Sequence, residues 1–101
     1  LKLQNFFSGL SSLRKLDLSF SNLYDGAIPN DLNGLSSLMD FNLRGNNFTS
    51  LPVGCISNLP KLEQFDLSNC VELQSIPLLP PNLLRVYVGC CPSIEPLLDM
   101  Q

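Results

Sequence analysis

The sequence predicts a short α/β solenoid, in which four strands form one curved parallel sheet and short helical turns or extended segments return behind it. Three observations predict this fold. Leucine fills 22 of the 101 positions and Ser and Asn fill 12 and 10, whereas an ordinary core mixes Leu with Val, Ile and Phe. One leucine frame occurs four times, and its copies are separated by 25, 24 and 21 residues. Such a period is typical of repeats that stack and cover one another's apolar faces.

The four frames begin near residues 13, 38, 62 and 83, and each follows the pattern L-x-x-L-x-L-x-x-N-x-L. The middle of each frame is expected to form a strand, because alternation along a strand directs every second side chain inward. The predicted inward pairs are Leu16 with Leu18, Phe41 with Leu43, Phe65 with Leu67, and Val86 with Val88.

The Asn position of the frame is expected to turn the chain, because its amide can bond backbone groups that the turn leaves unpaired. Asn46 fills this position in the second repeat, and Ser21 fills it in the first. Cys70 and Cys91 replace it in the third and fourth, where a thiol remains a weak donor.

The segments between the frames complete the domain plan, which is one repeat fragment over residues 1–101. Residues 10–13 and 35–38 both read Leu-Ser-Ser-Leu, so residues 1–12 are interpreted as the second half of a partial repeat. Residues 31–35 and 54–59 are long enough for one helical turn. Residues 75–82 contain three prolines and are predicted to be extended. Residues 95–101 are predicted to be a terminal segment outside the frame.

Composition excludes several classes of function. The net charge of −3 and the pI near 4.5 argue against a nucleic-acid partner. No apolar run reaches the length of about 18 residues that a membrane span needs, and no signal peptide opens the chain. The chain has no His, the usual general base and metal ligand at neutral pH. We therefore expect no enzyme, no cofactor site and no metal site in this segment.

The candidate binding residues are the strand positions that alternate with the inward pairs, because these positions form one continuous surface on the concave side. Mixed polar groups with one tyrosine suit a protein partner better than a small molecule. The alternative is that these side chains only solvate the strands. The candidates are Lys15, Asp17, Ser19, Asp40, Asn42, Arg44, Gln64, Asp66, Ser68, Arg85 and Tyr87.

Acidic and thiol clusters give weaker interpretations. Asp17 and Asp66 are two repeats apart, about 10 Å by strand spacing, which makes a poor acid–base pair, and no calcium loop is present. Cys70 and Cys91 occupy equivalent positions of adjacent repeats. They are expected to be buried thiols, although a disulfide stays possible in an oxidising compartment. A zinc site from these two and Cys90 lacks a fourth ligand.

Several motifs resemble plant leucine-rich-repeat proteins. Residues 23–29 are similar to an L-x-G-x-I-P block with one residue extra. Residues 67–77 fit L-x-x-C-x-x-L-x-x-[IL]-P, residues 79–83 fit L-P-P-x-L, and Cys91 precedes Ser-Ile-Glu. This combination resembles the C-terminal repeats of intracellular plant disease-resistance receptors, whose class carries a Toll/interleukin-receptor domain and a nucleotide-binding switch before the repeats.

The resemblance implies a protein-recognition and autoregulatory segment of a cytoplasmic immune receptor. Its implied partners are a pathogen effector or an effector-modified host protein, and the receptor's own nucleotide-binding domain. ADP or ATP is expected elsewhere in such a receptor, since no G-x-x-x-x-G-K-[ST] loop occurs here. The alternatives are an extracellular ectodomain fragment of a cell-surface plant receptor and a leucine-rich-repeat scaffold or inhibitor. The Asn47-Phe48-Thr49 sequon would carry a glycan only if the protein is secreted.

Overall fold

The fold is that of a computed structural model, which describes residues 7 and 9–94. Residues 1–6 and 8 of the predicted partial repeat, and the predicted terminal segment 95–101, lie outside the described residues. Within them the chain forms four strands: β1 (Lys15–Asp17), β2 (Asp40–Asn42), β3 (Gln64–Asp66) and β4 (Arg85–Tyr87).

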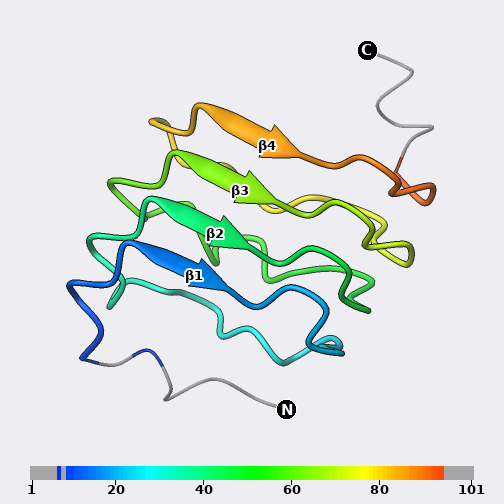
Figure 1. Cartoon of the computed structure of the whole chain (residues 1–101), viewed down its shortest axis with the longest axis horizontal. Helices are drawn as coiled ribbons and strands as arrows, with labels where there is room; N and C mark the ends of the chain where they lie inside the picture. The colour runs from blue at the N-terminus through cyan, green and yellow to red at the C-terminus, as the bar shows by residue number, and fades with distance from the viewer. Residues whose placement is uncertain (1–6, 8, 95–101) are drawn as a thin grey trace.

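The four strands form one parallel sheet in the order β1-β2-β3-β4, with consecutive repeats side by side (Figure 1). The central residues of the strands, Leu16, Phe41, Phe65 and Val86, are partners in register. The spacing of the leucine frames therefore predicted the sheet and its register correctly. Each of the first three strands is followed by a return segment behind the sheet, at residues 18–39, 43–63 and 67–84.

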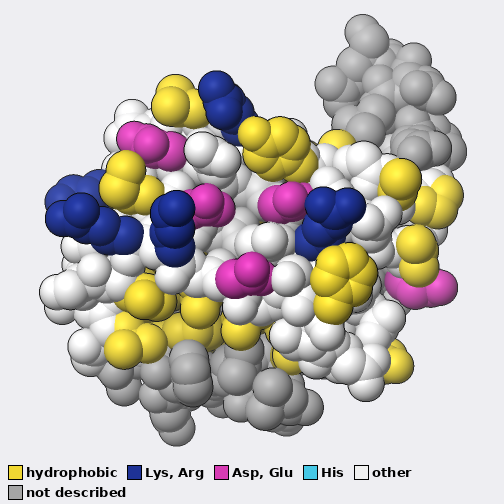
Figure 2. Space-filling model, in the orientation of Figure 1, with side chains coloured by type: hydrophobic (Ala, Val, Ile, Leu, Met, Phe, Trp, Pro, Cys, Tyr) yellow, Lys and Arg dark blue, Asp and Glu magenta, His cyan; other side chains and the backbone are white. Residues whose placement is uncertain are grey.

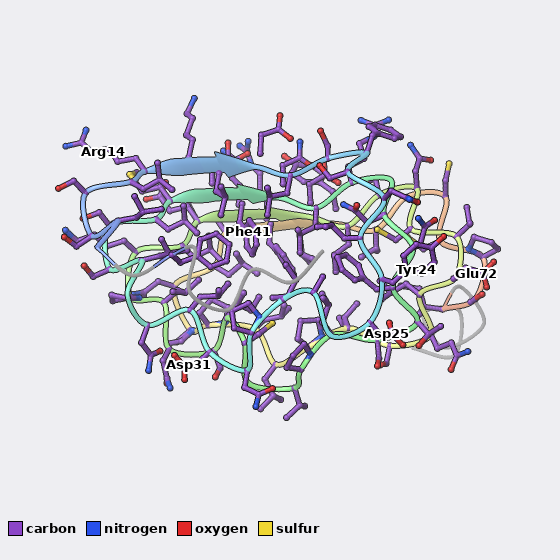
Figure 3. The ribbon with its side chains drawn as sticks, turned by 90° about the horizontal axis from the view of Figure 1, so that it is seen from below. Arg14, Tyr24, Asp25, Asp31, Phe41 and Glu72 are labelled. Atoms are coloured by element: carbon purple, nitrogen blue, oxygen red, sulfur yellow. The ribbon has the colours of Figure 1, made fainter. Side chains whose placement is uncertain are left out.

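The core lies between the sheet and the return segments. Phe41, Leu43, Phe65 and Leu67 are fully buried, and the rings of Phe41 and Phe65 pack with centroids 5.6 Å apart. Figure 3 shows Phe41 pointing from the sheet toward the return segments. The inward pairs of β1 and β4 pack on the same core but stay half-buried, because each has a described repeat on one side only.

The amide of Asn46 connects the first two repeats. It is the one buried polar side chain of the described residues. Its Nδ2 donates to the carbonyls of Leu18 and Leu43 at 2.9 and 2.8 Å. Its Oδ1 accepts from the backbone N–H groups of Ser21 and Leu23 at 3.2 and 3.0 Å. One side chain therefore satisfies four backbone groups at two successive turns, as predicted for this position.

The cysteines at the equivalent position continue the same contact with sulfur. Cys70 Sγ donates to the Leu43 carbonyl at 3.4 Å, and Cys91 Sγ donates to the Leu67 carbonyl at 3.1 Å. Both side chains are completely buried. Asn46, Cys70 and Cys91 thus each reach the equivalent leucine carbonyl of the preceding repeat, and we call these three residues the turn ladder.

The return segments contain turns but no helix within the described residues. The two Leu-Ser-Ser-Leu segments adopt the same turn. Leu13 N–H donates to Leu10 O, and Leu38 N–H donates to Leu35 O, both at 3.1 Å. The short helical turns predicted for residues 31–35 and 54–59 are isolated turns in the structure. A segment this short forms too few hydrogen bonds to offset the cost of nucleating a helix. Residues 74–80 lack regular structure, as their prolines predicted.

One residue per repeat adopts a left-handed conformation directly before the turn position. Phe20, Gly45, Asn69 and Cys90 have φ angles of 52°, 72°, 60° and 59°. Glycine and asparagine tolerate this conformation, whereas a bulky side chain there costs about 1–2 kcal/mol. Gly45 is further constrained, because a Cβ at this position would overlap the ring of Phe20.

Replacing Asn46 with Ala should destabilise the fold strongly. The change leaves four buried or half-buried backbone groups without partners, so we expect the free energy of unfolding to fall by at least about 3 kcal/mol. Urea unfolding measures the loss. Asn47→Ala is the matched control, because the Asn47 side chain makes one exposed bond, to Asn22, and the loss of that bond should cost less than about 1 kcal/mol. Equal unfolding midpoints for the two variants would contradict the ladder.

Gly45→Ala should lower the free energy of unfolding by about 1–2 kcal/mol, because alanine disfavours a positive φ and its methyl group meets the Phe20 ring. Adding Phe20→Ser should recover only the part that is due to the overlap. Thermal unfolding of Gly45→Ala and of the double variant separates the effect of the backbone conformation from that of the overlap. The control is Gly54→Ala, where the nearest heavy atom to an added Cβ is Ser57 Oγ at 3.6 Å.

Candidate protein-interaction surface

The outward strand positions form a surface of three rows that cross all four repeats. The register places Lys15, Asp40, Gln64 and Arg85 in the first row, and Asp17, Asn42, Asp66 and Tyr87 in the second. Backbone bonds Phe20 N–Arg44 O, Gly45 N–Ser68 O and Asn69 N–Gly89 O align the third row, which is Ser19, Arg44, Ser68 and Gly89. All the sequence-predicted candidates therefore lie together, and we call this surface the strand face.

Charges of both signs are interspersed over the strand face, with hydrophobic side chains between them (Figure 2). The first and last strands are more exposed than β2 and β3, which have neighbours on both sides. The surface carries no extended region of one charge. It therefore suits recognition by local complementarity rather than attraction of a highly charged polymer.

Three of the four second-row side chains also close the turn that follows their own strand. Asp17 Oδ1 accepts from Ser19 N at 2.9 Å, Asn42 Oδ1 accepts from Arg44 N at 2.9 Å, and Asp66 Oδ1 accepts from Ser68 N at 2.8 Å. This turn-closing role was not predicted from the sequence. Its signal was an Asp or Asn at the same position of three frames, since these residues bond backbone two positions ahead.

Tyr87 interrupts this pattern in the fourth repeat. A phenol does not reproduce the short turn-closing bond, and the Tyr87 side chain is 41% exposed. It makes no hydrogen bond within the described part of the chain. Tyr87 is therefore the second-row residue whose side chain does not close the turn after its own strand.

Hydrogen bonds to Ser19 hold the pKa of Asp17 below its usual value of 3.8, the side-chain bond contributing most. This carboxylate is thus anionic at neutral pH. Asn42 separates it from Asp66 in the second row, so the two carboxylates do not form a neighbouring pair.

All four cysteines are free thiols in the structure. Burial raises the pKa of Cys55 to about 11 and also raises the pKa of Cys70. Both thiols therefore stay protonated at neutral pH, which disfavours metal ligation and thiolate chemistry. Among the described residues, no group of three His, Cys, Asp or Glu side chains is placed to hold a metal ion. These residues also form no helix long and apolar enough to cross a membrane.

An open depression, which was not predicted from the sequence, lies beside the strand face. It has a volume of about 420 Å³ and is lined by Met39, Pro60, Lys61, Glu63, Asn82 and Leu84. These residues lie where the return segments enter β2, β3 and β4. Its lining combines the exposed Lys61 and the half-buried Glu63 with apolar side chains, which extends the mixed character of the strand face.

Comparison with known proteins agrees with this geometry. Two family models, both described as leucine rich repeat, match residues 29–71 and 12–35. Together they span the first three strands. The chain belongs to the leucine-rich-repeat family.

The leucine-rich repeats are similar to those of plant disease-resistance proteins. The chain is 44% identical over 82 residues to the TMV resistance protein N of Nicotiana glutinosa, which covers 81% of the chain. It is 42% identical over 89 residues to the disease resistance-like protein DSC1 of Arabidopsis thaliana, which covers 88%. The resemblance that the motifs predicted is confirmed.

The repeat framework alone accounts for part of this identity. Keratocan of Gallus gallus is 35% identical over 92 residues, or 90% of the chain. The chain spans 7% of the length of each of the two resistance relatives and 23% of keratocan. No solved structure matches the chain.

The sequon at Asn47 lies where the first two leucine-rich repeats are joined. Asn47 Nδ2 donates to Asn22 Oδ1 at 2.6 Å. The Thr49 hydroxyl donates to Asp25, whose Oδ1 also accepts from Thr49 N at 2.7 Å. The asparagine and threonine of the sequon thus both serve inter-repeat contacts in the folded chain.

Acid should weaken the contact between these two leucine-rich repeats. The Thr49 hydroxyl, together with the backbone of Thr49 and Ser50, lowers the pKa of Asp25 from its ordinary 3.8. A folded-state pKa below the unfolded value stabilises the fold above the unfolded pKa, and this stabilisation is lost as pH falls through the folded pKa. Asp17 contributes in the same direction.

We therefore expect urea midpoints that are constant from pH 7 to 5 and fall below about pH 4. Asp25→Asn should show lower stability at pH 7 and a flatter acid decline. Asp31→Asn is the control, because its carboxylate bonds only Asn33 N at 3.3 Å on the return side; Figure 3 shows both aspartates on that side. An unchanged acid decline in Asp25→Asn would contradict the assignment.

Proposed function

We propose that this chain is a protein-recognition segment of an intracellular plant immune receptor, and that the strand face is its recognition surface. The observation that carries the proposal is the pairing of the strands and of the residues that follow them, which brings the eleven predicted candidates from four repeats onto one surface. The identity to two disease-resistance proteins supports the immune setting.

The partners we propose are a pathogen effector or a host protein that an effector has modified. In the full receptor, the same array would also regulate a nucleotide-binding domain, where ADP or ATP would bind. The array itself would act by binding rather than by catalysis. Its mixed charges and its exposed tyrosine are the features that protein interfaces favour.

The cell-surface ectodomain is a weaker alternative. Its main support is the Asn47 sequon, and the side chains of Asn47 and Thr49 are engaged with Asn22 and Asp25. A glycan on Asn47 would replace the contact to Asn22 rather than extend from a free amide.

Tyr87→Ser tests the proposal in the full-length polypeptide that carries these repeats. We expect the cell-death response of leaves to the cognate pathogen protein to fall, with affinity reduced about tenfold or more, because aromatic residues are common interface hot spots. The melting temperature should not change, since the Tyr87 side chain makes no hydrogen bond within the described residues, and its backbone bond to Leu67 is kept in the variant.

Tyr24→Ser is the matched control. Tyr24 is 60% exposed and lies at the end of the molecule, away from the outer surface of the sheet (Figure 3). Its replacement should leave recognition intact. Recognition that survives in Tyr87→Ser, or that is lost equally in both variants, would contradict the strand face as the recognition surface.

A further inference from the structure

Phe20 is the bulkiest residue at a left-handed position that occurs once in each repeat, and two of the other three repeats fill this position with glycine or asparagine. The left-handed conformation at this position is filled by Gly45, Asn69 and Cys90 in the next three repeats. Glycine and asparagine visit this region readily, whereas a positive φ in a bulky residue is an outlier. Backbone strain of this kind is concentrated at sites where ligands are held.

Burial in the core does not explain why a phenylalanine stands at position 20. Its side chain is 67% exposed, so most of the ring remains in water. The ring rests against Gly45, where any Cβ would overlap it. The neighbouring repeat therefore supports one part of the ring while the rest faces outward at the edge of the strand face.

Arg44 pairs with Phe20 through the backbone, because the Phe20 N–H donates to the Arg44 carbonyl at 2.7 Å, and the Phe20 ring itself rests on Gly45, the residue that follows Arg44. The amide oxygen of Asn69, in its satisfied orientation, accepts from Arg44 Nε and Nη2 at 3.1 Å. This contact orients the guanidinium but leaves Nη1 available. Arg44 forms no ion pair with a carboxylate of the described residues.

Arg44 is also the only charged residue of the third row, whose other members are Ser19, Ser68 and Gly89. An oriented cation without a counter-charge, beside an exposed aromatic ring, is complementary to a carboxylate next to a large apolar side chain. A guanidinium whose other donors are already held loses less freedom when it binds an anion.

We propose that Phe20 and Arg44 form a paired anchor for a protein segment that presents a large apolar side chain beside an aspartate or glutamate. The proposal rests on the protein-recognition function and names the chemistry of the recognised segment. The apolar group packs on the outward side of the Phe20 ring, and the carboxylate accepts from the free Arg44 donors.

A phage-displayed library of random dodecapeptides, panned on the full-length polypeptide that carries these repeats, provides the probe. We expect the enriched peptides to share an Asp or Glu next to a Phe, Leu or Trp. A synthetic peptide of that sequence should bind at least tenfold more weakly to Phe20→Asn and to Arg44→Gln, as measured by fluorescence anisotropy. Val53→Ser is the matched control, because Val53 is also 67% exposed and lies on a return segment.

The melting temperature separates this role from a structural one. Phe20→Asn should keep or raise the melting temperature, since Asn69 holds the same conformation. A fall of several degrees would assign Phe20 to the fold and overturn the anchor.

Enriched peptides without a carboxylate would also overturn the anchor. So would peptides that bind Phe20→Asn and Arg44→Gln normally but fail on Tyr87→Ser, and that result would leave the recognition function standing. A library from which nothing is enriched would contradict both proposals.

Discussion

The contact on which the rest of the structure depends is the buried amide of Asn46. A parallel solenoid must reverse direction after every strand, and each reversal leaves inward backbone groups that water cannot reach. Asn46 satisfies two donors and two acceptors, which belong to two successive repeats. It therefore fixes the turn of one repeat and its distance from the next in a single side chain. The strands keep register because their exits are held at equal spacing.

The two cysteines of the turn ladder keep one part of this contact. A thiol has one proton to donate, and Cys70 and Cys91 each donate it to the leucine carbonyl of the preceding repeat. Burial raises the pKa of Cys70 and keeps its thiol protonated, which the donated bond requires. Packing is equally close along the solenoid, since Leu67 and Leu73 are completely buried, as are Leu23 and Leu43 in the preceding repeats.

The sequence was enough to predict the sheet, its register and the membership of the strand face. A two-residue alternation inside a leucine frame leaves only one way to orient a strand, so Phe41 and Leu43 must face inward and Asp40, Asn42 and Arg44 outward. The left-handed Phe20 could not be predicted, because its residue type argues against that backbone conformation. The turn-closing role of Asp17 and Asp66 was also missed, since it depends on where the backbone N–H lies after the strand. The return segments agree with the predicted short turns and extended segments, and none of the described ones extends into a helix, because segments of this length are too short to nucleate one.

The turn-closing bonds affect how the strand face can recognise a partner. Its three cations, Lys15, Arg44 and Arg85, balance its three anions, Asp17, Asp40 and Asp66, although the whole chain has a net charge of −3. Long-range steering by this surface is therefore weak, and selectivity must come from the placement of individual groups. Asp17 and Asp66 commit one oxygen each to the backbone, which restricts their rotamers before any partner arrives. Such side chains lose little entropy on binding. The same hydrogen bonds that end the strands thus make their carboxylates better contacts, so fold and recognition are built from one set of residues.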